Sequence, residues 1–119
     1  MAGQMVHLEL PAADTEASRA FWGGLFGWEF QAFEGSSTEY HMARFSDTQG
    51  GAIQQRDEST SSPRVYFDVD DAKAAVAKVK ELGGQASDPM PVPGMGWFAT
   101  CKDTEGNDFG LWQTDASAA

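Results

Sequence analysis

Two blocks of this sequence recur in the same order further along the chain. The matched positions are Asp14 with Asp71, Gly27 with Gly84, and the turn 47–50 with the turn 103–106. The first two pairs are 57 residues apart, and the two turns are 56 residues apart. Matches in one order at nearly one offset predict an internal duplication, so the chain is expected to fold as two copies of one unit.

The first copy predicts one helix and four strands. Alternating apolar residues predict a strand at 5–10, which Pro11 is expected to end. Asp14 or Thr15 is placed to cap a helix that stops at Gly27. The three further strands are expected at 28–33, 39–45 and 51–55.

The second copy repeats this order. A strand is expected at 64–69, a helix from Asp70 or Asp71 to about Leu82, and short strands at 85–86, 96–102 and 108–113. The Pro- and Met-containing segment 89–96 is expected to be an irregular loop, which either contacts ligand or packs over the end of the sheet. Residues 57–63 are expected to link the copies.

The predicted fold is therefore α+β: two tandem βαβββ modules in a single domain spanning 1–119. Module one covers about 5–56 and module two about 64–113. Each helix covers one face of its sheet, and the opposite faces are expected to form a cleft. The aromatic residues near the end of the first helix are expected in the core, as is the apolar stripe of the second helix. These residues are Phe21, Trp22, Phe26 and Trp28, and Ala75, Val76, Val79 and Leu82.

Charge and cysteine content exclude several classes of partner. The 119 residues carry 8 Lys and Arg against 18 Asp and Glu, a net charge of −10. Nucleic acid and anionic membranes need a positive protein surface, so neither is expected as a partner. The single cysteine, Cys101, precludes an intrachain disulfide and is expected to be a buried apolar residue, in agreement with a cytoplasmic protein. We find no membrane span, signal peptide, four-cysteine zinc site or P-loop.

Strand alternation assigns a small set of side chains to the expected cleft. His7 and Glu9 share one strand face. Three interpretations of this pair stay open: a metal ligand with a second acid, a general acid–base pair, or a polar lining of the cleft. Arg64 is placed to bind a carboxylate or phosphate, or to neutralise Glu9 or Asp68. Tyr66 and Trp112 suit a planar or cationic ligand, or fill the space themselves. His41 is interpreted as a sheet histidine; alternation does not show which face of strand 39–45 lines the cleft.

Several segments resemble the vicinal oxygen chelate superfamily, the group of glyoxalases, bleomycin-resistance proteins and dihydroxybiphenyl dioxygenases. They are the starting strand His7-Leu-Glu-Leu, the helix end Leu25-Phe-Gly-Trp28, the strand Val65-Tyr-Phe-Asp-Val-Asp-Asp71, Glu81-Leu-Gly-Gly84, and the turn Asp103-Thr-Glu-Gly-Asn107. In that turn Thr104 stands where the family usually has proline. The resemblance covers about 5–113 and implies a homodimer.

The resemblance also implies a metal held at four positions, here His7, Gln54, Arg64 and Gly110. His7 and Gln54 have donor atoms, but a guanidinium has no lone pair to offer and glycine has no side chain. A second set would join Glu9 and Asp108 to His7 and Gln54.

The sequence does not decide whether the protein is an enzyme. The leading hypothesis is a metal-free protein that binds a cationic or aromatic small molecule through His7, Glu9, Gln54, Arg64, Tyr66 and Trp112. The alternatives are a metal-dependent isomerase, lyase or dioxygenase, in which a divalent metal polarises adjacent substrate oxygens, and an interaction module with a filled cavity.

Overall fold

The chain folds into two compact units that follow the predicted duplication. The computed structural model describes residues 2–36, 38–58 and 60–119. The N-terminal module comprises Val6–Arg64, and the C-terminal module comprises Val65–Ala119 with the first residues of the chain up to Met5. The mixed α+β fold predicted from the sequence is confirmed.

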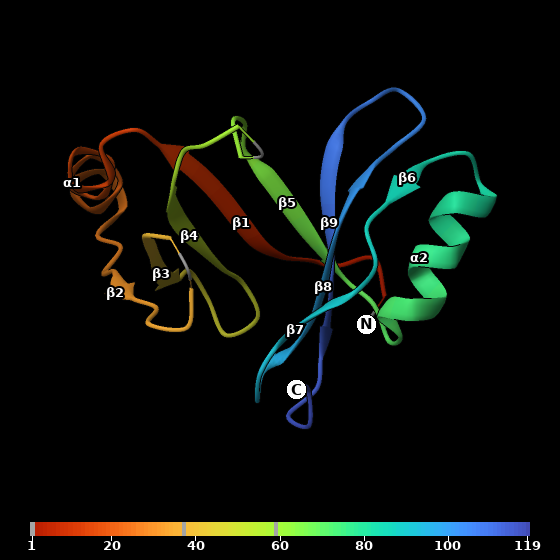
Figure 1. The fold of residues 1–119 in the computed structure, drawn as a ribbon. Coiled ribbons are helices and arrows are strands. Elements are labelled where there is room, and N and C mark those ends of the chain that lie inside the picture. The colour runs from red at the N-terminus through yellow and green to blue at the C-terminus, as the bar shows by residue number, and fades with distance from the viewer. Residues whose placement is uncertain (1, 37, 59) are drawn as a thin grey trace. The chain divides into compact units, whose positions relative to one another are not determined.

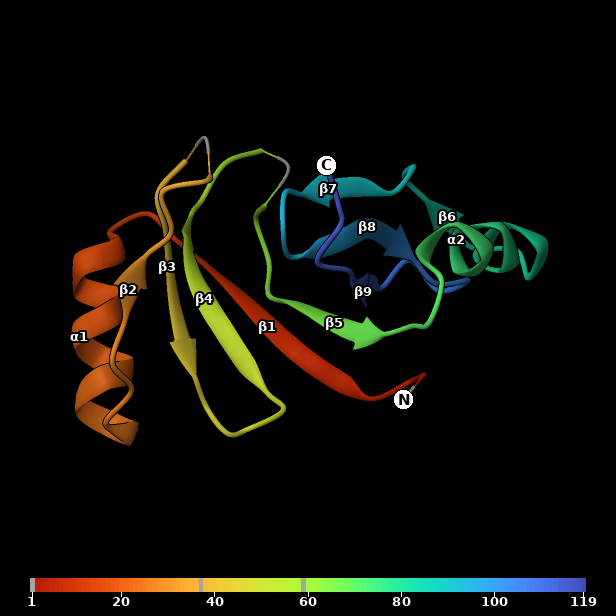
Figure 2. The same ribbon diagram turned by 90° about the horizontal axis from the view of Figure 1, so that it is seen from below.

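The N-terminal module is a small sheet with one helix (Figure 1). Its elements are β1 (Met5–Ala12), α1 (Thr15–Phe26), β2 (Gln31–Ala32), β3 (Tyr40–Arg44) and β4 (Gly50–Gln55). The strand order is β2-β3-β4-β1, with β1 parallel to β4 and the other neighbours antiparallel. Figure 2 shows α1 lying alongside β2, β3 and β4.

The C-terminal module has the same plan. Its elements are β5 (Arg64–Asp68), α2 (Ala72–Glu81), β6 (Gln85–Ala86), β7 (Met90–Val92), β8 (Gly96–Lys102) and β9 (Asp108–Thr114). The order is β5-β9-β8-β6, and β7 also pairs with β8. Between α2 and this sheet lies a core of Val76, Ala99, Cys101 and Leu111. The predicted burial of Cys101 is confirmed.

Two predicted strand boundaries are wrong. Pro11 does not end the first strand, which continues to Ala12 with Pro11 in register opposite Gln54. Proline removes one amide donor but leaves its neighbours able to bond, and the Arg56 amide donates to the Ala12 carbonyl at 2.9 Å. The strand expected at 28–33 shortens to Gln31–Ala32. Before it, Trp28 stacks on Phe45 with ring centroids 4.0 Å apart.

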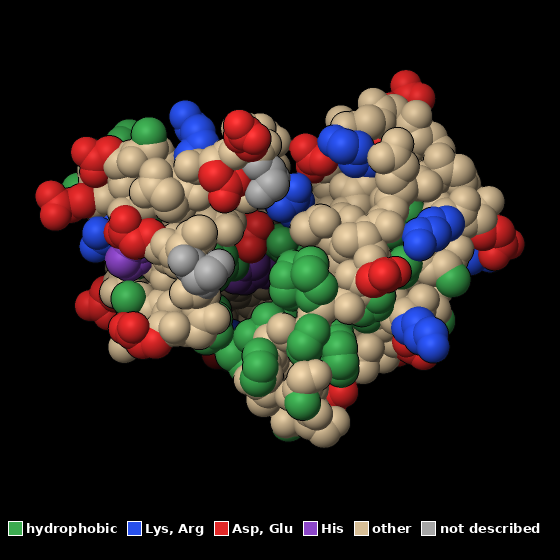
Figure 3. Space-filling model, in the orientation of Figure 1, with side chains coloured by type: hydrophobic (Ala, Val, Ile, Leu, Met, Phe, Trp, Pro, Cys, Tyr) green, Lys and Arg blue, Asp and Glu red, His purple; other side chains and the backbone are tan. Residues whose placement is uncertain are grey.

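The segment 89–96 is not wholly irregular, because it contains β7. Met90 pairs with Phe98, and Val92 pairs with Gly96. Pro91 alternates with these residues and has no amide hydrogen to present at the outer edge, which protects this edge from pairing with another strand. Met90 and Met95 are exposed, and Figure 3 shows hydrophobic side chains gathered over β7.

Both helices begin and end where the sequence predicts. The apolar stripe of α2 packs on the core as predicted at Ala75, Val76 and Val79, whereas the aromatic face of α1 differs from expectation. The Asp14 carboxylate accepts the Ala17 amide at 3.0 Å, and Gly27 ends α1 in the left-handed region with φ 73°. Phe21, Leu25 and Phe26 are 62%, 57% and 57% exposed, so the prediction of a buried aromatic face is wrong for Phe21 and Phe26.

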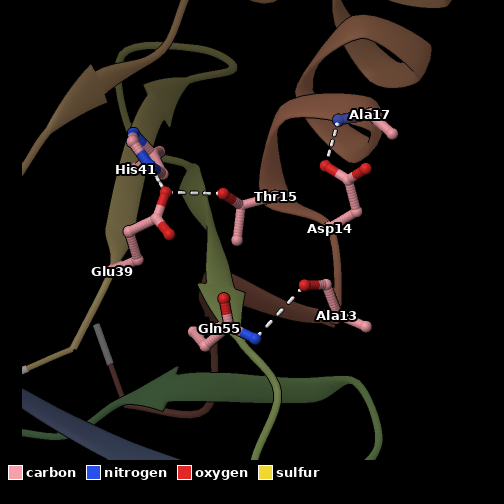
Figure 4. Close-up of polar contacts among 7 residues, drawn as sticks. All are labelled: Ala13, Asp14, Thr15, Ala17, Glu39, His41 and Gln55. Atoms are coloured by element: carbon pink, nitrogen blue, oxygen red, sulfur yellow. Dashed lines mark hydrogen bonds and ion pairs between the residues drawn. The ribbon is translucent and has the colours of Figure 1, made fainter.

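Polar contacts attach the first turn of α1 to the sheet (Figure 4). Thr15 is buried and donates to Glu39 at 2.6 Å, and Gln55 donates to the Ala13 carbonyl at 3.3 Å. Leu82, expected in the core, is also exposed because it lies beyond the last turn of α2. In the described part of the chain, no helix combines the length and apolar character needed to cross a membrane.

Candidate functional site

Strand register divides the N-terminal sheet into two faces. His7 lies opposite Gly50, Glu9 opposite Ala52, and Tyr40 opposite Gln54. Alternation therefore places His7, Glu9, Gln54 and Tyr40 on one face, which we call the helix-free face. His41 lies on the other face, where its Nε2 is 2.9 Å from Glu39 beside Thr15 of α1 (Figure 4).

This arrangement identifies the residue of strand 39–45 that joins the candidate site. It is Tyr40, which the sequence analysis did not single out. His41 pairs with Glu39, in agreement with its interpretation as a sheet histidine. Alternation shows that Tyr40 and His41 lie on opposite faces of the strand, but it does not show which of them faces the candidate site. The signal that would have decided this is the pairing of Tyr40 with Gln54, a predicted site residue on β4.

A chain of polar contacts runs across the helix-free face. The Tyr40 hydroxyl donates to Glu9 Oε2 at 2.9 Å and lies 2.7 Å from His7 Nε2. Tyrosine has one hydroxyl proton, so while that proton is donated to Glu9 the short contact requires a proton on His7 Nε2. Glu9 itself is buried. The arrangement orders three titratable groups and holds the His7 ring in one tautomer.

Burial determines the charge of His7. Removal from water lowers the pKa of His7 to about 4, because the protein around it solvates the imidazolium poorly. At neutral pH His7 is therefore uncharged.

Arg64 lies at the start of β5 beside Glu9. Its Nη1 is 3.8 Å from Glu9 Oε1, and its side chain is only 13% exposed. This separation exceeds a normal hydrogen bond. Within the described residues the buried Arg64 Nε has no hydrogen-bond partner, and neither has the buried Oε1 of Gln54. Both atoms therefore keep unused hydrogen-bonding capacity.

The C-terminal sheet carries aromatic rings on the corresponding face. Tyr66 pairs with Gly110 and is 5% exposed. A Cβ on Gly110 would overlap the Tyr66 ring, so this glycine makes the room that the ring occupies. Trp112 shares the face of Gly110 and lies over Gly96, and its Nε1 donates to Thr114 at 3.1 Å. Phe98 pairs with Trp112 on the same face.

The residues at the four family metal positions do not fit a divalent cation. His7 Nε2 is committed to Tyr40, Arg64 is a cation, and the Tyr66 ring lies where a side chain of residue 110 would be. Among the described residues, no group of three or more His, Cys, Asp and Glu side chains is arranged to hold a metal ion. Asp108, from the second predicted ligand set, forms an ion pair with Lys102 at 2.7 Å.

The structure thus brings together four of the predicted residues and adds Tyr40. His7, Glu9, Gln54 and Arg64 lie in the N-terminal module, while Tyr66 and Trp112 share a face of the C-terminal module. The predicted cleft and the part of each residue in ligand binding stay predictions.

Comparison with known proteins places the chain in a family. Residues 5–112 match the glyoxalase-like domain. A glyoxylase-like domain-containing protein of Didymella fabae is 33% identical over 88% of this chain and 89% of its own length. The anthracycline biosynthesis protein DnrV of Streptomyces peucetius is 28% identical over 93% of this chain, which spans 47% of that protein.

The solved structures agree with this assignment at the level of the fold. Methylmalonyl-CoA epimerase from Mycobacterium tuberculosis superimposes with a TM-score of 0.71, covering 95% of this chain and 88% of the epimerase at 12% identity. The chain therefore belongs to the glyoxalase-like family of the vicinal oxygen chelate superfamily.

Proposed function

We propose that this protein binds an aromatic small molecule without a metal ion, and that the helix-free face of the N-terminal module recognises its polar group. The observation that carries the proposal is the half-buried contact chain His7–Tyr40–Glu9–Arg64 on the helix-free face of the N-terminal module, in which Glu9 is buried. Burying this many polar groups costs free energy, and Arg64 and Gln54 retain unpaired atoms. Such a face is better suited to recognising a polar ligand group than to stabilising the fold.

The charge of the face supports the metal-free part of the proposal. Arg64 stands at a family metal position and carries a permanent positive charge, which opposes a divalent cation at short range. His7 Nε2 is engaged by the Tyr40 hydroxyl at 2.7 Å, so binding a metal through this nitrogen would require that contact to break. The guanidinium can instead donate hydrogen bonds to a ligand oxygen.

The aromatic part of the proposal is supported by the C-terminal module. Phe98 and Trp112 share a sheet face with the buried Tyr66, and their half-buried rings favour a planar aromatic partner. The resemblance to an anthracycline biosynthesis protein is consistent with this ligand class. Of the two ligand classes expected from the sequence, we therefore prefer the aromatic one. A cation would have to compete with Arg64 for Glu9.

The proposal is tested by a thermal-shift screen of neutral and cationic aromatic compounds in the presence of a chelator. A hit is then located by two-dimensional NMR. We expect a concentration-dependent rise in melting temperature, with shifts at the His7 and Arg64 resonances and not at His41 on the opposite face. Binding that requires added divalent metal and disappears in His7→Ala would contradict the proposal. It would favour the metal-dependent enzyme instead.

A further inference from the structure

Two buried atoms of the N-terminal module have complementary unmet hydrogen-bonding needs. Arg64 Nε carries a hydrogen to donate, and Gln54 Oε1 has lone pairs that accept. Neither has a hydrogen-bond partner in the part of the chain that the structure describes. Leaving a buried donor or acceptor unpaired is costly, so both atoms favour whatever molecule satisfies them.

Strand pairing and side-chain contacts relate these two residues to one part of the helix-free face. Gln54 lies opposite Tyr40 in the β3–β4 pair. The Tyr40 hydroxyl bonds to Glu9, and Glu9 is the ion-pair partner of Arg64. Gln54 therefore shares the helix-free face with Tyr40 and Glu9, and Arg64 adjoins this face through Glu9.

The chemistry of the site narrows the ligand group. A carboxylate would accept from Arg64 but has no hydrogen for Gln54, and Glu9 would repel it. A ketone accepts from Arg64 and likewise leaves Gln54 unpaired. A neutral group with an acceptor beside a donor satisfies both atoms.

Resting on the proposed function, we propose that the aromatic ligand presents a neutral acceptor–donor pair to this site, as a carboxamide or a hydroxy-ketone does. The ligand carbonyl accepts from the Arg64 guanidinium, and the adjacent N–H or O–H donates to Gln54 Oε1. Since both protein atoms are closed to solvent, the flexible ends of Arg64 and Gln54 shift to admit the group. Arg64 then sets affinity for the carbonyl, and Gln54 sets preference for the donor.

Three probes of nearly equal shape test this inference. Benzamide has acceptor and donor, acetophenone replaces the amide nitrogen with a methyl group, and benzoate offers only acceptors and a negative charge. We expect wild-type protein to bind benzamide about 5-fold more tightly than acetophenone, since a neutral hydrogen bond contributes about 1 kcal/mol. Benzoate is expected to bind most weakly. Ligand-observed NMR titration measures dissociation constants in this weak range.

The variants separate the two side chains. Gln54→Met keeps the length of the side chain and removes its acceptor, so benzamide and acetophenone should bind equally while acetophenone affinity is unchanged. Gln55→Met is the matched control, because Gln55 is the next residue of β4 and its amide contacts Ala13 on the opposite face. Arg64→Met should weaken both neutral probes. If that variant does not fold, Arg64→Lys keeps a charge and loses the Nε donor.

The outcomes distinguish the two proposals. If none of the three probes saturates the wild-type protein, the proposed function fails and this inference fails with it. If the probes bind but benzamide has no advantage, or keeps it in Gln54→Met, the inference is overturned and the proposed function stands. Gln54 and Arg64 would then be satisfied by an ordered water.

Discussion

The two modules share a strand plan and differ in what their helix-free faces carry. At equivalent positions, Glu9 and Gln54 of the N-terminal module become Tyr66 and Gly110 of the C-terminal module, and Tyr40 becomes Gly96. In one module a tyrosine ring reaches over the sheet to bond a carboxylate. In the other, glycines make room for the rings of Tyr66 and Trp112. The duplication thus preserves the backbone, while exchange of large and small residues separates a polar face from an aromatic one.

The largest expected effect comes from adding a side chain to Gly110, where the Tyr66 ring packs. Gly110→Ala places a Cβ into the Tyr66 ring, so we expect a loss of about 3 kcal/mol or more in the free energy of unfolding, measured by urea denaturation. Gly24→Ala is the control, because no atom lies within 4 Å of its added Cβ. It should stabilise α1 by about 0.5 to 1 kcal/mol. Equal effects of the two substitutions would contradict the packing of Tyr66 on Gly110.

His7, on the helix-free face of the N-terminal module, should make the stability of the protein depend on pH. Folding lowers the His7 pKa from 6.5 to about 4. Between these pH values the unfolded chain therefore binds a proton at His7 that the folded chain does not bind. This contribution is fully present above pH 6.5 and is lost as the pH falls towards 4. It amounts to about 2 to 3 kcal/mol. Denaturation of wild type and His7→Asn at a series of pH values measures it. Parallel curves for the two proteins would refute the buried neutral histidine.

A smaller effect is expected from the hydroxyl that joins His7 to Glu9. Tyr40→Phe removes both contacts and leaves the buried carboxylate with one hydrogen bond fewer, which should cost about 1 to 2 kcal/mol. NMR titration of the His7 ring protons should also show a changed pKa. Unchanged stability together with an unchanged His7 titration would show that the contact chain does not form in solution.

The smallest effect is expected on the helix with the exposed apolar residues. Phe21→Ala should change stability by no more than about 0.5 kcal/mol, because the ring is largely in solvent. Val76→Ala in α2 removes a core side chain and should cost about 1 to 2 kcal/mol. Thermal unfolding of both variants makes the comparison. A large loss in Phe21→Ala would show that another surface covers α1.

The sequence predicts the architecture well because duplication, caps and alternation are local signals. Asp14, Asp71 and Gly27 occupy their predicted capping positions. Local signals do not reveal what a helix rests on. The aromatic residues of α1 predicted a buried face, but Thr15 and Gln55 attach its start to the sheet through polar contacts.

The candidate site was predictable in part for the same reason. Alternation placed His7 and Glu9 on one face correctly. Tyr40 was missed because its orientation depends on the pairing of β3 with β4, which is a long-range contact. The role of Gly110 could not be predicted from the sequence either, because this glycine makes room for the ring of Tyr66, which lies on a different strand.

Elemental analysis tests the central claim most directly, namely that the polar face binds its ligand without a metal. Wild type and His7→Ala are loaded with nickel, zinc, manganese or iron and then desalted. We predict well under one retained ion per chain and the same low amount in both proteins. Nearly one ion per chain in the wild type, lost in His7→Ala, would contradict the account and establish His7 as a metal ligand.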